Sequence, residues 1–356
     1  MKNREITIAD RKIGAGKATF FIAEISANHG QDINKAIELI KMAKNAGADA
    51  VKFQTYTPDT MTLDSDKEWF KIEHPKWSGQ TLYELYQKAY TPWKWFQRLK
   101  KEADKAGLIF FSTAFDKTAV DFLEELGVAA HKIASFELVD LPLIEHAART
   151  GKPLIFSTGM AVKEEIKDAV WAAKQAGARD IVLLKCVSGY PADPCEMNLR
   201  TIPDMQKEFN LPIGLSDHTL EMIVSFSAVS VGACVIEKHF TDSRERETPD
   251  SFFSTEPREF KKLVDNVRMG DIGASEKILG GVHYGLTPGQ KKSRIFRRSL
   301  FVVEDIKKGE RFTEANIRSL RPDVGLKPKY FKDVLGKRAE RDIEKGSPLK
   351  RSMIGG

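Results

Sequence analysis

The sequence has few cysteines and no long apolar run, and each absence excludes a class of protein. Its 356 residues contain three cysteines, Cys186, Cys195 and Cys234, too few and too odd in number for a disulfide framework. No segment approaches the roughly 18 consecutive apolar residues of a membrane span, and the charged start lacks the apolar core of a secretory signal. A hydrophobic content of 42% with 30% charged residues excludes a disordered or fibrous chain. We therefore expect a cytoplasmic protein with no membrane partner.

Acidic residues are scarce at the end of the chain. From Gly285 onward there are 19 Lys and Arg against 9 Asp and Glu, a net charge of +10, and the residues before Gly285 sum to −4. A basic segment can bind nucleic acid or attract an anionic substrate. Because the acidic residues are interleaved with the basic ones and few aromatics accompany them, we expect no nucleic-acid partner.

Short apolar runs alternate with segments of helical period between about residues 18 and 270. We interpret eight runs as strands: 18–26, 50–57, 108–115, 129–135, 153–160, 181–191, 212–219 and 234–241. Helical patterns, often ended by glycine, lie between them at 33–46, 93–106, 119–126 and 162–176. Continuous apolar runs are typical of parallel strands covered on both faces. Eight such units in about 250 residues predict an α/β fold, a (β/α)8 TIM barrel. A doubly wound sheet is the second choice, because the first strand lacks a glycine-rich turn.

Other segments surround this pattern. Residues 6–14 resemble a hairpin that could close the barrel floor, and the long insertion 57–91, with an amphipathic stretch at 81–88, resembles a lid. We expect a barrel with its hairpin over 1–270, a linker over 271–292 and a small, mostly irregular β domain over 293–356. Within the last we expect a strand at 295–303, a short helix at 313–318, and two copies of an Asp-Ile-x-Lys-Gly turn at 305–309 and 342–346.

Polar residues recur where each predicted strand ends, which is where parallel barrels place their active sites. Satisfied ion pairs that stiffen the barrel are the plain explanation, but recurrence at every strand end favours a polar ligand. His218 and His239 end neighbouring strands and could share a divalent ion, with Glu24 or Glu237 nearby. A purely structural role for the two histidines is about as well supported by the residues alone. The strand-end lysines suit a phosphate or carboxylate, and neighbouring carboxylates argue against Schiff-base chemistry.

Five motifs together resemble the sialic acid synthase family. They lie at 23–29 (AEISANH), 52–56 (KFQTY), 190–191 (YP), 214–219 (GLSDHT) and 236–240 (IEKHF). The resemblance spans about residues 15–352 and implies a TIM barrel followed by a C-terminal antifreeze-like (SAF, β-clip) domain. Enzymes of this family condense phosphoenolpyruvate with an amino-sugar aldehyde to form nine-carbon 2-keto acids. Val187 and Ala114 depart from the residues usual in the family.

The resemblance also implies roles for individual residues. It assigns His218 and His239 to a divalent metal, Mn²⁺ first, with Mg²⁺ or Co²⁺ as alternatives, and makes them catalytic with Glu24 and Glu137. C3 of the enol would attack the aldehyde, and the two glutamates would stabilise the resulting cation and manage water protons. Phosphoenolpyruvate would be bound by Lys52, Thr113, Lys132, Ser135 and Ser157, and the sugar by Gln54, Tyr190, Asp250 and Arg321. Arg321 would come from the partner of a domain-swapped homodimer.

Within the family, the segments 54–59, 82–86, 249–254 and 325–330 most resemble the pseudaminic acid synthases. These condense 2,4-diacetamido-2,4,6-trideoxy-L-altrose, and Phe252 and Phe253 are our candidates for contact with its methyl group. An N-acetylneuraminate or legionaminic acid synthase is the alternative of the same class. A non-catalytic sugar-binding barrel is the alternative of another class, and the retained histidines, glutamates and lysines argue against it. An ice-binding role for the C-terminal domain is disfavoured by its many charges.

Overall fold

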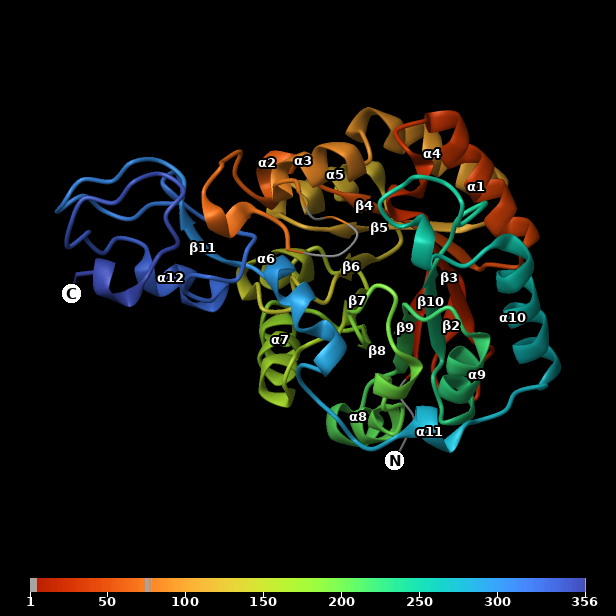
Figure 1. Ribbon diagram of the computed structural model, residues 1–356. Coiled ribbons are helices and arrows are strands. Elements are labelled where there is room, and N and C mark those ends of the chain that lie inside the picture. Colours follow the sequence, from red (N-terminus) through yellow and green to blue (C-terminus); the bar gives the residue numbers. More distant parts are fainter. Residues whose placement is uncertain (1–4, 74–76, 78, 356) are drawn as a thin grey trace.

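The computed structural model describes residues 5–73, 77 and 79–355, which form a parallel barrel with a smaller domain beside it (Figure 1). Eight strands close the barrel in the order β10-β3-β4-β5-β6-β7-β8-β9. The strands are β3 Phe20–Glu24, β4 Ala50–Thr55, β5 Ile109–Ala114, β6 His131–Ile133, β7 Leu154–Ser157, β8 Ile181–Cys186, β9 Ile213–Asp217 and β10 Val235–His239. Each lies within one of the eight predicted runs, so the predicted TIM barrel is confirmed and the doubly wound alternative is wrong.

Helices cover the outside of the barrel and bury their apolar faces against the strands. They are α1 Ile33–Asn45, α4 Phe96–Lys105, α5 Lys117–Leu126, α6 Leu141–Ala148, α7 Lys163–Gln175, α8 Thr201–Phe209, α9 Met222–Ser230 and α10 Pro257–Met269. The predicted hairpin is present as β1 Ile6–Ile8 paired with β2 Arg11–Ile13, and its isoleucines join the barrel core. Within the described residues, no helix is long and apolar enough to span a bilayer.

The insertion after β4 lies at the mouth of the barrel. It contains α2 Pro58–Met61 and α3 Leu82–Ala89, and its residues 74–76 and 78 lie outside the described part. Thr81 caps α3, because its Oγ1 accepts from the Glu84 amide at 3.2 Å while Glu84 accepts from the Thr81 amide at 2.8 Å. The buried face of α3 carries Leu82, Leu85 and Tyr86. The amphipathic segment predicted at 81–88 is therefore confirmed as a helix, and its inner face helps to form the cavity described below.

The C-terminal domain follows a segment that contains the short helix α11 Glu276–Leu279. Its antiparallel strands are β11 Ser299–Val302 and β12 Ile317–Leu320, and α12 Phe331–Val334 follows them. The strand expected at 295–303 begins only at Ser299, after a 3-10 helix at Lys292–Phe296. The helix expected at 313–318 is wrong: residues 314–316 form a turn, and β-branched Ile317 starts a strand that pairs with Val302.

The two Asp-Ile-x-Lys-Gly turns pair with each other. Ile306 and Ile343 exchange both backbone hydrogen bonds, at 2.9 and 2.8 Å. Each aspartate then accepts from the backbone of the other turn, Asp305 from the Lys345 amide at 2.7 Å and Asp342 from the Lys308 amide at 2.8 Å. The repeat in the sequence thus builds one reciprocal pair of turns at the edge of the domain core.

The basic C-terminal domain docks on acidic positions of barrel helices. Lys327 pairs with Glu165 at 2.9 Å and Lys329 with Asp168 at 3.1 Å, both on α7. In Figure 1 this domain (blue) stands beside α6 and α2. Part of the +10 charge is therefore used in contacts between the two parts of the chain.

Candidate active site

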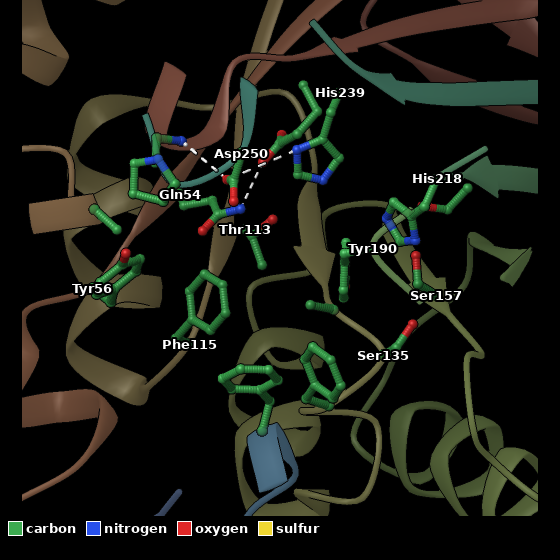
Figure 2. Close-up of a pocket in the computed structure, with 18 of the residues that line it drawn as sticks. Gln54, Tyr56, Thr113, Phe115, Ser135, Ser157, Tyr190, His218, His239 and Asp250 are labelled. Carbon is green, nitrogen blue, oxygen red and sulfur yellow. Dashed lines mark hydrogen bonds and ion pairs between the residues drawn. The ribbon is translucent and has the colours of Figure 1, made fainter. Parts of the chain in front are cut away.

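A cavity opens at the carboxyl ends of the barrel strands (Figure 2). The predicted site residues that line it are Glu24, Lys52, Gln54, Thr113, Lys132, Ser135, Ser157, Tyr190, His218, His239, Asp250 and Arg321. Strand register explains why they meet: Glu24 is the direct neighbour of Lys52 on β4 and of His239 on β10. Thr113 likewise pairs with Gln54 on one side and with Lys132 on the other. Parallel pairing thus gathers residues that lie more than 200 positions apart.

Two buried lysines and their hydroxyl partners form a cationic corner. The Lys52 ammonium donates to Thr113 Oγ1 at 3.0 Å, and the Lys132 ammonium donates to Ser157 Oγ at 2.7 Å. Both lysines are only 2% exposed, and burial lowers the pKa of Lys132 despite nearby Glu237. Two buried ammonium groups and several buried hydroxyls are suited to hold a phosphate and a carboxylate.

Ser135 lies beside this corner, where the backbone of Gly159 passes close to its side chain. Its Oγ accepts from the Gly159 amide at 3.0 Å. A Cβ at position 159 would lie 2.8 Å from Ser135 Oγ and 2.2 Å from Ser188 Oγ. Only glycine therefore lets the loop after β7 pass this close to the hydroxyls.

Two carboxylates neutralise the lysines. Glu24 Oε2 lies 2.6 Å from the Lys52 ammonium, and Glu237 Oε1 lies 3.6 Å from the ammonium groups of both Lys52 and Lys132. Burial raises the pKa of Glu24 to about 7, against the opposing effect of Lys52. Burial also acts on Glu237, but Lys132 and Lys52 outweigh it and hold its pKa below the ordinary value. Glu24 is therefore the carboxyl that can take up and release a proton near neutral pH.

The two histidines lie side by side in the cavity. Their ring centroids are 5.3 Å apart. Nδ1 of His218 is engaged by the Val187 carbonyl at 2.9 Å, which leaves Nε2 free of that bond. Nδ1 of His239 is buried without a hydrogen-bond partner in the described structure. Burial, then the positive charges around it, lowers the pKa of His239 well below its usual value, so its imidazole is neutral. Burial also acts on His218, but the effect of the Cys186 thiol and the Val187 carbonyl outweighs it and raises the pKa of His218.

Because no set of three or more His, Cys, Asp or Glu side chains gathers as a metal cluster within the described residues, a metal here would have two protein nitrogens. Substrate and water would complete its coordination, as in a Lewis-acid site. The residues present fit such an ion. The unusual Val187 acts on His218 through its main-chain carbonyl, so that contact does not depend on a side-chain hydroxyl at this position.

The other side of the cavity combines polar groups with an aromatic wall. Gln54 and Asp250 lie near His239 in Figure 2, while Ser135 and Ser157 lie toward His218. The wall is formed by Tyr56, Trp77, Tyr86, Phe115, Phe136, Phe253 and Phe296. Phe253 is the predicted methyl contact that reaches the cavity, with its ring 4.8 Å from that of His239. Phe252 packs against it, at 5.0 Å between ring centroids.

Arg321 reaches this wall from the C-terminal domain of the same chain. It is 5% exposed, its Nη1 donates to the Tyr86 hydroxyl at 2.9 Å, and its guanidinium lies 5.0 Å from the Phe136 ring centroid. This position agrees with the expectation that Arg321 lies at a barrel mouth. We expected Arg321 to come from a partner subunit, whereas in this single chain the C-terminal domain covers the barrel of its own chain.

Glu137 is the predicted catalytic residue that the structure does not bring to the cavity wall. Its Oε1 accepts from Arg298 Nε at 3.0 Å and from Arg321 Nη2 at 2.7 Å, and the side chain is fully buried. Two guanidiniums thus contact one oxygen of the carboxylate that was expected to face the reacting atoms, and the other oxygen, Oε2, is buried without a hydrogen-bond partner in the described structure. In this structure Glu137 holds the Arg321 guanidinium in place, and its catalytic role stays a prediction.

Sequence reasoning missed two features of the site. Glu237 was considered only as a neighbour of the histidines, although its place between two lysine-bearing strands follows from the barrel order. The aromatic wall had no comparable signal, because Trp77, Phe136 and Phe296 come from separate loops whose packing no strand register fixes.

Comparison with known proteins agrees with these observations. Residues 39–279 match the NeuB family, and residues 297–355 match the SAF domain. The chain is 44% identical to the pseudaminic acid synthase of Campylobacter jejuni over 336 residues, covering 94% of this chain and 96% of the relative. It is also 44% identical to the pseudaminic acid synthase of Helicobacter pylori, covering 94% and 97%. The crystal structure of the spore coat polysaccharide biosynthesis protein SpsE of Bacillus subtilis superposes with a TM-score of 0.85 at 33% identity and covers 99% of both chains. The chain therefore belongs to the NeuB family, the sialic acid synthase family that its motifs resemble.

Proposed function

We propose that the protein is a metal-dependent pseudaminic acid synthase. It would condense phosphoenolpyruvate with 2,4-diacetamido-2,4,6-trideoxy-L-altrose and water to give pseudaminic acid and phosphate, with cleavage of the C–O bond. The observation that supports this most is one cavity lined by the cationic corner of Lys52 and Lys132, by the histidine pair and by an aromatic wall. The 44% identity to pseudaminic acid synthases supports the choice of sugar.

The residues of the cavity fit the steps of this reaction. Lys52, Lys132, Thr113, Ser135 and Ser157 bind the phosphate and carboxylate of phosphoenolpyruvate and orient C3 of the enol toward the sugar aldehyde. As C3 attacks, positive charge develops at C2, and the Glu24–Glu237 pair stabilises it from the same side of the pocket. Water then adds at C2, Glu24 takes up a proton in this step because its pKa is near neutrality, and the tetrahedral intermediate expels phosphate.

His218 and His239 would hold a divalent ion, Mn²⁺ by preference with Mg²⁺ and Co²⁺ as alternatives, which would polarise the aldehyde oxygen. Gln54, Tyr190, Asp250 and Arg321 would contact the sugar. Phe253 would pack against the methyl group at C6, because an apolar ring discriminates against a substrate that carries a hydroxyl there.

We further propose that the enzyme works in the cytoplasm, where phosphoenolpyruvate is made, and as a homodimer that exchanges C-terminal domains. We take the segment 271–292 as the linker between domains 1–270 and 293–356. If this linker follows another path, the same docking contacts form between two chains instead of within one.

One assay tests the proposed function. Phosphate release from phosphoenolpyruvate is measured with 2,4-diacetamido-2,4,6-trideoxy-L-altrose, N-acetylmannosamine and the precursor of legionaminic acid, each with and without Mn²⁺. We expect the highest kcat/KM with the altrose derivative. Higher kcat/KM with either other sugar contradicts the choice of sugar and retains the reaction class, whereas no phosphate release with any of them contradicts both.

A further inference from the structure

Ser26 is a buried residue that no step of the reaction uses, and its backbone is in an unusual conformation. It follows β3 with φ at +48° and is 1% exposed. A left-handed conformation costs free energy for any residue with a Cβ, and glycine adopts it more readily. Such strain at a functional site persists when the side chain is used there, which directs attention to the Ser26 hydroxyl.

That hydroxyl joins two residues that we propose as sugar contacts. Ser26 Oγ donates to Asp250 Oδ2, and it accepts from Gln54 Nε2 at 2.7 Å. Gln54 Nε2 also donates to Glu24 Oε1 at 2.9 Å. The loop after β3 therefore links the end of β4 to the loop after β10.

The hydrogen-bond pattern shows which atoms of Gln54 and Asp250 remain available to a ligand. The single Ser26 proton goes to a carboxylate that can only accept, so Ser26 must accept from Gln54, and both protons of the Gln54 amide are then in use. Within the described residues, the carbonyl Oε1 of Gln54 and Oδ1 of Asp250 have no hydrogen bond to the protein. Both atoms are acceptors, so the ligand groups that meet them must be donors, such as a hydroxyl or an amide N–H.

We infer that Ser26 is a positioning residue for the sugar, which orients Gln54 and Asp250 as a pair of acceptors for hydroxyl or N–H groups of the substrate. This inference rests on the proposed function, since it deepens the assignment of Gln54 and Asp250 to the sugar. Within the described residues, Ser26 makes no hydrogen bond to Lys52 or Lys132 and reaches the cationic corner only through Gln54 and Glu24. We therefore expect Ser26 to affect phosphoenolpyruvate binding less than sugar binding.

Two variants separate the hydroxyl from the backbone strain. Ser26→Ala removes the hydroxyl and keeps the strain, whereas Ser26→Gly removes both. We expect the KM for the sugar to rise about tenfold in each variant, as for loss of the hydrogen bonds of one group, with the KM for phosphoenolpyruvate within twofold of wild type. Ser225→Ala is the matched control, because Ser225 donates to buried Asp217 at 2.6 Å outside the cavity, and we expect it to lower Tm without raising the sugar KM.

The inference would be overturned if the KM for the sugar is unchanged in both Ser26 variants. It would also be overturned if the KM for phosphoenolpyruvate rises as much as the KM for the sugar. Crystal structures of both variants provide a readout that needs no turnover. We expect the side chain of Gln54 or Asp250 to adopt a new rotamer, and unmoved side chains would contradict a positioning role. If wild-type protein turns over none of the three sugars, the proposed function fails, and these structures alone decide the role of Ser26.

Discussion

Neutralising Glu137 should loosen the C-terminal domain and weaken sugar binding together. Its carboxylate is the acidic partner that contacts two buried guanidiniums, Arg298 at 3.0 Å and Arg321 at 2.7 Å. The arginines are 2% and 5% exposed, so in Glu137→Gln two positive charges would remain buried without this counterion. Removing one partner of a buried ion pair costs about 3–5 kcal/mol. Because the glutamine oxygen can still accept one hydrogen bond, we expect a loss near the lower end, about 3 kcal/mol.

The assay is urea denaturation with an exposed ion pair as the control. Lys329 and Asp168 also join the domain to the barrel, at 3.1 Å, but their side chains are 38% and 45% exposed. Asp168→Asn should therefore cost less than about 1 kcal/mol, and its effect should diminish with salt. Limited proteolysis of the segment 271–292 should accelerate in Glu137→Gln and not in Asp168→Asn.

A double-mutant cycle connects this stability change with function. If Glu137 acts by positioning Arg321, then Glu137→Gln and Arg321→Ala should each raise the KM for the sugar, and the double variant should be no worse than the more impaired single variant. A loss of stability below 1 kcal/mol, or additive effects on KM, would refute this reasoning. A fall in kcat with both KM values unchanged would restore Glu137 to the chemical step.

Further predictions concern the metal, the stability in acid, and whether the C-terminal domain is exchanged between subunits. His218→Ala and His239→Ala should each abolish Mn²⁺ binding measured by electron paramagnetic resonance, with Tm close to wild type, and wild-type turnover of both variants at low metal would exclude the site. Burial lowers the pKa of His29 from 6.5 to about 4, so the unfolded chain takes up its proton first and stability falls as pH decreases from 6.5 toward 4. This group alone should make the protein about 2 kcal/mol less stable at pH 5 than at pH 7 in urea titrations, and an equal pH dependence in His29→Gln would contradict it. In a domain-swapped homodimer, mixing Arg321→Ala with His239→Ala protein should restore part of the activity, because one site of each mixed dimer keeps both residues. Exchange of subunits without any return of activity would mean that the domain acts within its own chain.

The barrel and most of its site could be predicted because both depend on strand pattern. A polar residue such as Lys52 within an apolar run must face the barrel interior or the mouth, and parallel order then places it beside Glu24 and Thr113. The C-terminal domain has fewer regular elements, and there the sequence pattern gave a wrong prediction of secondary structure. Residues 313–318 have helix-compatible composition, but the pairing of Ile317 with Val302 determines their conformation.

Long-range charge pairing explains why the ion pairs of Glu137 could not be predicted from the sequence. It follows strand β6 in the same way as Ser135, so its sequence position fits the cavity. Its partners Arg298 and Arg321 lie 161 and 184 residues further along, and nothing in their local sequence shows that they turn back onto this loop. The contact is decided by the docking of one domain on another.

The balance of charge in the cationic corner determines how an anion can enter it. Without substrate, Lys52 and Lys132 are neutralised by Glu24 and Glu237, so the buried corner carries no large net charge. A phosphate and a carboxylate arriving there would face two negative groups, and at least one must lose its charge or move away. Glu24 is the group that can do so, because its pKa of about 7 allows it to bind a proton as the anion approaches, while Glu237 stays ionised between the lysines. Release of that proton, once the lysines hold the phosphate and the carboxylate, would return Glu24 to the ionised form that takes up a proton when water adds at C2. Binding and acid–base chemistry would therefore be coupled through Glu24.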